Sequence, residues 1–324
     1  MNVKFNVVSD TELVAPCPGA PMAAPITVKI VADSINESGD RLVTWCWEYW
    51  RGIHEEVMTH RDLSRNSASS RAIPAKKMRD WVTGRPAVPF DWGKNQRGMQ
   101  SSDEQVDPEV GREWWLRGLD MMARHHAEGE ALGLHKQTVN RVIQPWMMIA
   151  VVMSSTQHAN LFHLRKHEAA EPHFQVLATL AWELFHNHMP TYLASGEWHL
   201  PYVDADTYAK VLNNNDLKKV SAGRCARVSY LTHEGRRDIA EDIALHDRLA
   251  GTASMGADPM HASPFEHQAT PTPGARHGNF QGWKQYRKFF PQEAGPDTSA
   301  RCLLCGCWGD RHVTTCPEKD DPRP

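Results

Sequence analysis

The sequence predicts an α+β fold, in which a mixed or antiparallel sheet carries helices and a small cysteine-rich tail follows at the C-terminus. Residues 27–32 and 41–48 are rich in β-branched and aromatic side chains, as strands are. Apolar residues recur at helical spacing within 108–132 and 173–188. The glycine motifs of dinucleotide-binding and P-loop folds are missing, so a doubly wound parallel sheet has no support.

Composition is that of an ordinary soluble protein with a sizeable core. The 324 residues are 41% hydrophobic and 23% charged, and they include 12 Trp. A net charge of −3 argues against nucleic acid as a general partner. The longest apolar run, 146–153, is far shorter than a membrane span, and the N-terminus lacks signal-peptide features. We therefore expect no membrane contact and a cytoplasmic location, in the host cytoplasm if the chain is viral.

The first half of the chain alternates short regular elements with polar segments. After the two strands, a helical pattern covers 53–60. Residues 64–74 are too rich in Ser, Asn and Arg to be expected in the core. A short helix at 76–83 precedes residues 84–108, whose Pro, Gly, Asn and Ser content is typical of a long loop.

Helices dominate the second half. Trp115, Leu119 and Met122 fall on one face of the helix expected at 108–132. The apolar run 146–153 is a candidate buried strand. Further helices are expected at 136–143, 156–168, 173–188, 204–212 and 238–249, and a loop at 271–278.

The segment 59–74 is the clearest candidate for anion binding. It carries three arginines, Arg61, Arg65 and Arg71, among several serines. Guanidinium groups and hydroxyls are the donors that a phosphate monoester needs. The alternative is a solvated polar loop.

Two shorter segments also mix polar and apolar residues. In 261–271, His261 and Ser263 flank a Pro-Phe pair and could hydrogen-bond a ring cofactor; the alternative is an ordinary helix start. In 160–165, Asn160 and Arg165 lie on a predicted helix. Arg165 either points into a site between helices or is a surface charge over the core.

Four C-terminal residues have the spacing of a compact zinc site. These are Cys302, Cys305, His312 and Cys316, with Cys307 as a substitute ligand. The alternative is a tail with free thiols.

Together these segments resemble the flavin-dependent thymidylate synthases, the ThyX family. The family signature is Arg-His-Arg-x-x-Ser-x-Asn-Glu-x-Ser-x-Arg-Tyr. The matching positions here are Thr59, His60, Arg61, Ser64, Asn66, Ser67, Ser69, Arg71 and Ala72. Thr59, Ser67 and Ala72 depart from that signature.

Two further family features recur, in an unusual order. Arg141 precedes a Pro and a strand, and Asn160 and Arg165 follow, as in the family. An Ala-Arg-Val-Ser-Tyr segment at 226–230 leads to His-Ala-Ser-Pro-Phe-Glu-His at 261–267. In typical members that last piece precedes the arginine signature, so the order resembles a circular permutation. The amino-acid sequence of the signature region is similar to that of bacteriophage members.

The resemblance implies an enzyme that methylates dUMP to dTMP. Methylene-tetrahydrofolate would supply the carbon, FAD the hydride, and NADPH would reduce the flavin, at sites between subunits of a homotetramer. Arg165 would be the catalytic residue that polarises uracil. The implied dUMP contacts are Glu56, Ser69, Arg71, Arg141 and Arg165, and the implied FAD contacts are His60, Arg61, Asn160, His261 and Ser263.

The expected organisation has four parts. They are an N-terminal segment at 1–26, a permuted ThyX-like catalytic domain at 27–270, a linker with an aromatic-basic stretch at 271–298, and the zinc-binding tail at 299–324. Two other functions remain open. One is flavin-dependent hydroxymethylation of dUMP or dCMP for phage DNA modification. The other is nucleic-acid binding led by the tail and by the basic residues near Trp283, which a helix packing Trp283 inward would also explain.

Overall fold

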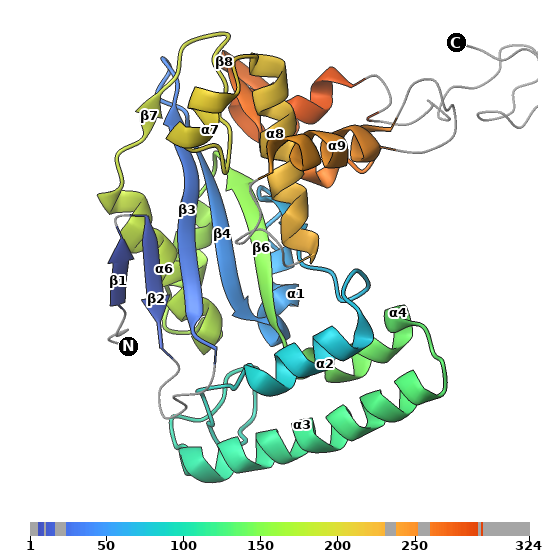
Figure 1. Ribbon diagram of the computed structural model, residues 1–324. Helices are drawn as coiled ribbons and strands as arrows, with labels where there is room; N and C mark the ends of the chain where they lie inside the picture. Colours follow the sequence, from blue (N-terminus) through green and yellow to red (C-terminus); the bar gives the residue numbers. More distant parts are fainter. Residues whose placement is uncertain are drawn as a thin grey trace, which may run out of the picture.

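A mixed sheet forms the centre of the molecule. The computed structural model describes residues 6–9, 11–16, 24–230, 238–251, 260–290 and 293. Within them, seven strands pair in the order β1-β2-β3-β4-β6-β5, with antiparallel neighbours, and β7 runs parallel beside β3 (Figure 1). The strands are β1 (Asn6–Ser9), β2 (Glu12–Ala15), β3 (Ile26–Ile35), β4 (Arg41–Trp50), β5 (Ser64–Ser67), β6 (Met148–Ser155) and β7 (Thr191–Tyr192). The α+β prediction is confirmed.

Helices cover both faces of this sheet. One face carries α1 (His54–Met58), α5 (Ala159–Arg165) and α6 (Pro172–Asn187), packed on Trp45, Trp47 and Tyr49 of β4. The other face carries α8 (Asn214–Arg227), whose Cys225 packs on Ala150 and Val152 of β6. Because both faces are covered, every residue of β6 is buried.

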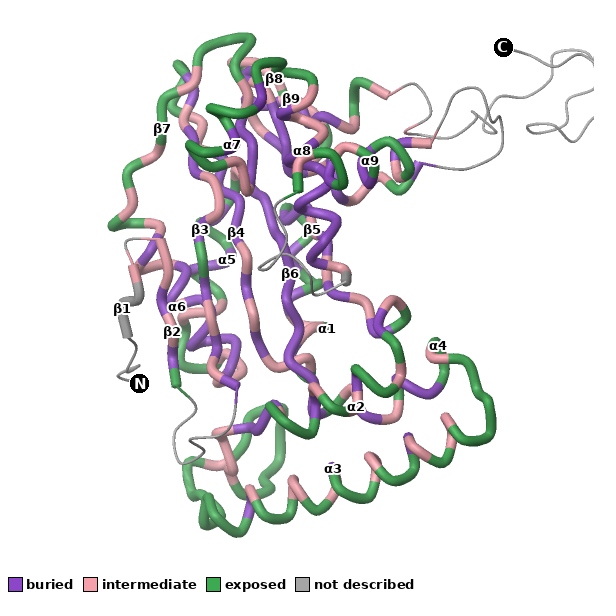
Figure 2. Tube along the Cα trace, in the orientation of Figure 1, coloured by how far each residue is buried: buried purple, intermediate pink, exposed green. Residues whose placement is uncertain are grey.

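The remaining elements lie at the two ends of the sheet (Figures 1 and 2). At one end are α2 (Ala75–Gly84), α3 (Pro108–Ala131), α4 (Lys136–Val139) and the 3-10 helices η1 (Arg51–Ile53) and η2 (Asn140–Trp146). At the other are α7 (Ala205–Lys210), α9 (Ile239–Ala250), the hairpin β8 (Ala269–His277) and β9 (Phe280–Gln285), and η3 (Val228–Tyr230), η4 (Ser263–Glu266) and η5 (Tyr286–Phe289). Within the described ranges, no helix has both the length and the apolar character that crossing a bilayer requires.

Two loop predictions were wrong. The polar segment 64–74 begins with strand β5, and its Ser64, Asn66 and Ser70 are buried because each finds hydrogen-bond partners. Residues 271–278 were expected to be a loop, but most of them belong to β8, which pairs with β9. Trp283 does point inward, at 0% exposure, from a strand rather than a helix.

Helix α8 was not anticipated, and a glycine explains how it fits. A Cβ on Gly223 would lie 2.3 Å from the carbonyl oxygen of Asp242 in α9. The two helices therefore cross at a distance that only glycine permits. At this crossing Asp242, fully buried, accepts hydrogen bonds from Arg224 Nε at 2.9 Å and Arg227 Nε at 2.6 Å.

This buried ion cluster predicts the effect of removing its carboxylate. Asp242→Ala removes the carboxylate that pairs with buried Arg224 and leaves Arg227 with only its longer pair to Glu241, at 3.5 Å, so we expect the free energy of unfolding to fall by ~3–5 kcal/mol. Asp206→Ala is the matched control, because Asp206 is exposed and pairs with Lys210 one helical turn away. Its expected cost is below about 0.5 kcal/mol. Urea denaturation measures both, and equal losses would contradict the prediction.

Candidate functional site

The edge strand β5 lies at the centre of the candidate site. Its register places Ser64 opposite Ser154 and Arg65 opposite Met153 of β6. Because side chains alternate along a strand, Ser64 and Asn66 face α8 and the hairpin, while Arg65 faces α1. The strand thus contacts segments on both faces of the sheet.

On the α8 face, Asn66 joins β5 to the end of α8. Its Nδ2 donates to the carbonyl oxygen of Cys225 at 2.8 Å, and the Ser229 hydroxyl donates to its Oδ1 at 3.2 Å. The Ser69 amide donates to the Ser229 carbonyl oxygen at 3.1 Å. The 226–230 segment is therefore held against the arginine-bearing segment.

The start of β5 on the same face is joined to the Ser-Pro-Phe-Glu segment. Gln285 Nε2 donates to Ser64 Oγ at 2.8 Å and to the Glu266 carbonyl oxygen at 3.1 Å. Ser263 begins η4, half-buried, and η4 packs against β5 and α8. His261 precedes it and is exposed.

On the opposite face, Arg165 is bonded to the segment that leads into β5. Its Nε donates to His60 Nε2 at 2.8 Å, and its Nη2 donates to Thr59 Oγ1 at 3.0 Å. The guanidinium carbon also lies 4.8 Å from the centre of the Phe174 ring. These contacts fix the orientation of Arg165 through neutral partners, so its charge is not neutralised by them.

His60 must be neutral to make this contact. Burial lowers its pKa to about 4, and the positive charges of Arg165 and Arg65 act in the same direction. At neutral pH the imidazole therefore carries one proton, and Nε2 has the lone pair that accepts from Arg165.

Beyond the C-terminal end of β5, Asn140 joins η2 to the segment that follows the strand. Its Nδ2 donates to the carbonyl oxygens of Ser70 at 2.7 Å and Ile73 at 2.9 Å. Arg71 follows Ser70 in the chain and Arg141 follows Asn140, and both arginines are exposed. The predicted phosphate residues Ser69, Arg71 and Arg141 thus lie on segments that are bonded together.

Two arginines with no assigned role belong to the same region. Arg65 donates to the carbonyl oxygens of Met58 and His60, each at 3.0 Å. Burial lowers the pKa of half-buried Arg51, and the positive charge of Arg141 also lowers it. Arg65 is one of the three arginines that the sequence predicts for anion binding, although it occupies a variable position of the family motif. Arg51 follows an apolar strand, so the sequence offered no specific signal for it.

The arginines around β5 are not directly neutralised within the described residues, although the charges of Glu55 and Glu266 offset in part, from a distance, the lowering of the pKa of Arg51 and of Arg65 by burial. None forms an ion pair with a carboxylate there, unlike the Arg224 and Arg227 pair of the α8–α9 crossing. This set comprises Arg51, Arg65, Arg71, Arg141 and Arg165. A cluster of uncompensated guanidinium groups attracts a polyanion.

The other predicted residues fall into two groups. Arg61 is exposed on the turn after α1, next to His60 in the chain, and Asn160 is exposed at the start of α5. His261 and Ser263 lie on the α8 face, so one chain does not bring all five predicted FAD residues together. Glu56 is half-buried on α1, and its Oε2 is buried with no hydrogen-bond partner. A ligand donor would satisfy that oxygen.

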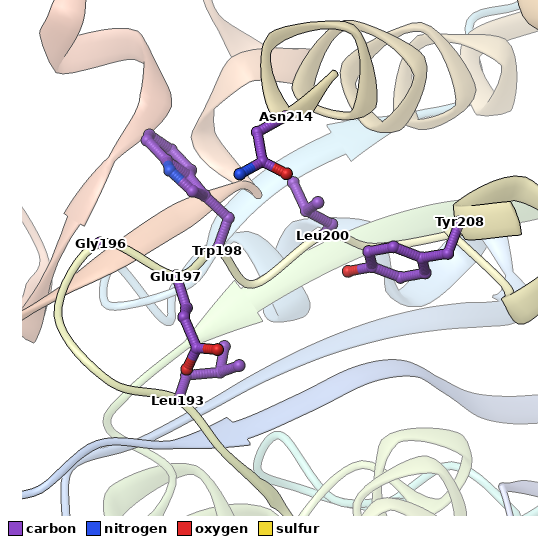
Figure 3. Close-up of a pocket in the computed structure, with 7 residues that line it drawn as sticks. All are labelled: Leu193, Gly196, Glu197, Trp198, Leu200, Tyr208 and Asn214. Carbon is purple, nitrogen blue, oxygen red and sulfur yellow. The ribbon is translucent and has the colours of Figure 1, made fainter. Parts of the chain in front are cut away.

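Other predicted features lie elsewhere. The zinc residues Cys302, Cys305, His312 and Cys316 are outside the described residues, and the part of the chain that is described has no cluster suited to a metal ion. A pocket of ≈190 Å³ lies away from β5, between the 193–200 loop, α7 and α8 (Figure 3). It contains none of the predicted site residues; its lining is Leu193, Gly196, Glu197, Trp198, Leu200, Tyr208 and Asn214.

The contact between Arg165 and His60 predicts a coupled titration. Arg165→Ala removes a positive charge beside His60, so the pKa of His60 should rise from about 4 toward 6.5. In the wild type, the hydrogen bond persists at neutral pH and is lost as the pH falls through about 4, where Nε2 is protonated. NMR of ¹⁵N-labelled histidine measures both the pKa of His60 and the protonation of its Nε2. Arg61→Ala is the control and should leave the titration unchanged; an unaltered titration in Arg165→Ala would refute the coupling.

Solved structures that resemble this chain include two that are remote from it in sequence and that act on uridine nucleotides or carry FAD and dUMP. No family model and no curated protein matches the chain. A UMP/dUMP methylase, PolB, from Streptomyces cacaoi has a TM-score of 0.41 at 13% identity, over 49% of this chain and 88% of its own. The flavin-dependent thymidylate synthase ThyX from Helicobacter pylori, complexed with FAD and dUMP, has a TM-score of 0.32 at 14% identity, over 44% of this chain and 67% of its own. Both scores are below 0.5, so neither likeness by itself establishes an activity.

Proposed function

We propose that this chain is a flavin-dependent thymidylate synthase that methylates dUMP, with the nucleotide lying along β5. The observation that carries the proposal is the convergence of the motif segments on that strand and on the residues that flank it. Arg165 bonds to His60, Asn140 to Ser70, and Gln285 to both Ser64 and Glu266. These segments are far apart in sequence.

The phosphate of dUMP is assigned to the C-terminal end of β5. Arg71 and Arg141 supply guanidinium groups, and Ser69 supplies a hydroxyl. Arg51 and Arg65 add positive charge without direct neutralisation. Glu56, whose buried Oε2 has no partner in the free protein, would accept a hydrogen bond from the nucleotide.

The uracil ring is assigned to the other end, beside Arg165. A guanidinium held by His60 and Thr59 is pre-oriented, so little reorganisation is needed when charge develops on the ring. Its charge stabilises enolate-like density on uracil and makes C5 nucleophilic. This route needs no cysteine nucleophile, and burial raises the pKa of Cys225, which disfavours its thiolate.

FAD fits the polar residues that flank this end. Arg61, which follows His60 in the chain, and Asn160, at the start of α5, are both exposed and available as donors. Bound FAD would supply the hydride, with NADPH as its reductant and methylene-tetrahydrofolate as the carbon source. Because His261 and Ser263 lie on the other face of the sheet, we assign them to a flavin shared with a neighbouring subunit of a homotetramer.

The reversed order of the motifs is assigned to circular permutation. The Ser263–Glu266 segment packs against β5 although it follows β5 by about two hundred residues. Permutation preserves such a contact while changing the order of its parts. The C-terminal cysteines remain a proposed zinc site, and a bacteriophage origin remains a proposal from the resemblance.

The direct test is the colour and product of the purified protein. We expect flavin absorbance near roughly 370 and 450 nm after incubation with FAD. With dUMP, methylene-tetrahydrofolate and NADPH, we expect a product heavier by about 14 Da. A gain of about 30 Da would instead indicate hydroxymethylation, the alternative left open by Thr59, Ser67 and Ala72. A protein that binds neither FAD nor dUMP would overturn both the methylation and the hydroxymethylation proposals.

Two substitutions separate binding from catalysis. Arg165→Ala should lower kcat by ~10²–10³ while FAD binding is retained, because it removes charge stabilisation that acts in the transition state. Arg71→Ala should raise KM for dUMP by ~10-fold or more, through loss of a charge-assisted hydrogen bond. Arg248→Ala, on the exposed side of α9, is the control. Unchanged dTMP formation by Arg165→Ala would contradict the assigned role.

A further inference from the structure

The turn at 69–72 carries Arg71 and determines where its guanidinium group lies. The Ala72 amide closes this turn by donating to the Ser69 carbonyl oxygen at 2.9 Å. Arg71 is exposed, and no side chain among the described residues hydrogen-bonds its guanidinium. The direction of the guanidinium therefore depends on how firmly the backbone of the turn is held.

Asn140 of η2 is the buried support of this turn. Its Nδ2 donates one hydrogen to the carbonyl oxygen of Ser70 at 2.7 Å and the other to that of Ile73 at 2.9 Å. Lys136 and Gln144 add single hydrogen bonds to the turn, but both are half-buried, whereas Asn140 is 0% exposed. A carboxamide rotated by 180° would face both carbonyl oxygens with its own oxygen, so the orientation of Asn140 decides whether the turn is held.

His126 of α3 sets the orientation of that carboxamide. Its Nε2 lies 3.0 Å from Asn140 Oδ1, and its Nδ1 lies 3.2 Å from Nη1 of Arg79 in α2. An arginine can only donate, so Nδ1 accepts and Nε2 carries the ring hydrogen. A donor at Nε2 requires the carboxamide oxygen beside it, which leaves Nδ2 facing the turn. His126 is 0% exposed, so this contact is shielded from water.

The chain of donors begins at an ion pair between α2 and α3, which lie side by side (Figure 1). Arg79 Nη1 also donates to Glu130 Oε2 at 2.6 Å, and Glu130 lies one helical turn after His126 in α3. Each link then has one donor and one acceptor, from Arg79 through His126 and Asn140 to the carbonyl oxygens of the turn. A buried chain in which every group is satisfied is rigid and specifies one arrangement.

We propose that His126 is a positioning residue for dUMP binding, which acts through Asn140 to hold the turn at 69–72 and thereby directs Arg71 toward the nucleotide phosphate. This inference rests on the proposed function, because it takes Arg71 as a phosphate contact. His126 is buried behind Asn140 and does not touch the nucleotide. A donor that is fixed before binding need not be ordered by the ligand, so the effect falls on the affinity for dUMP rather than on the chemical step.

Two substitutions separate the hydrogen bond of His126 from its volume. His126→Phe keeps a planar ring but has no N–H for Asn140 Oδ1, so KM for dUMP should rise ~5–10-fold in the FAD-loaded enzyme, with kcat within about twofold of wild type. His126→Gln has an amide N–H that can reach Oδ1, so its KM should stay within about twofold of wild type. Steady-state kinetics of product formation measure both constants.

A double-mutant cycle tests whether the effect passes through Arg71. In the Arg71→Ala background, His126→Phe should raise KM by no more than about twofold, because the side chain that it positions is gone. Leu119→Ala is the control for loosened helix packing, since Leu119 is buried between α3, α2 and η2 but lies outside the hydrogen-bond chain. It should lower the melting temperature and leave KM unchanged.

Hydrogen exchange observes the turn without any ligand. Peptides covering 68–73 should exchange faster in His126→Phe than in wild type, but not in His126→Gln or Leu119→Ala. Unchanged exchange in His126→Phe, an equal rise of KM in the Arg71→Ala background, or a comparable rise of KM in Leu119→Ala would overturn the role of His126. A wild type that does not bind dUMP would overturn the proposed function and the phosphate contact of Arg71 with it, whereas unchanged exchange alone overturns only the role of His126.

Discussion

The candidate site depends on one constraint, which is that the polar edge strand β5 lies inside the fold. Buried Ser64 and Asn66 must have hydrogen-bond partners, since an unsatisfied buried polar group is costly. Those partners come from β9, α8 and η3, which lie more than 150 residues further along the chain. The same bonds that satisfy the strand therefore assemble the motif segments around it.

Electrostatics follow from that assembly. The segments carry arginines toward one strand without close ion pairs to carboxylates among the described residues, whereas Asp242 pairs directly with the buried arginines of the α8–α9 crossing. Burial keeps His60 neutral, so it can orient Arg165 by accepting a hydrogen bond without cancelling its charge. The fold thus places uncompensated positive charge where an anionic nucleotide could bind.

Sequence patterns predicted most of the regular elements but not the polar ones. The strands β3, β4 and β6 and the helices α3 and α6 have strong apolar periodicity, and all five were predicted. The sequence predicted loops where β5 and β8 form. Their high content of Ser, Asn, Pro and Gly obscures the alternation of buried and exposed side chains that is typical of a strand. α8 was missed because it starts in a run of asparagines and contains Gly223, which only the distant α9 explains. His60 and Arg165, which the resemblance assigns to FAD and dUMP respectively, are hydrogen-bonded to each other. Arg51 became visible only through its burial and its neighbour Arg141.

The most direct measurement is a crystal structure of the protein soaked with FAD and dUMP. The account predicts the phosphate of dUMP within about 3 Å of the Arg71 and Arg141 guanidinium groups. It also predicts the uracil ring against Arg165, with the flavin beside it. Nucleotide density away from β5, for example in the pocket lined by Glu197 and Tyr208, would contradict it.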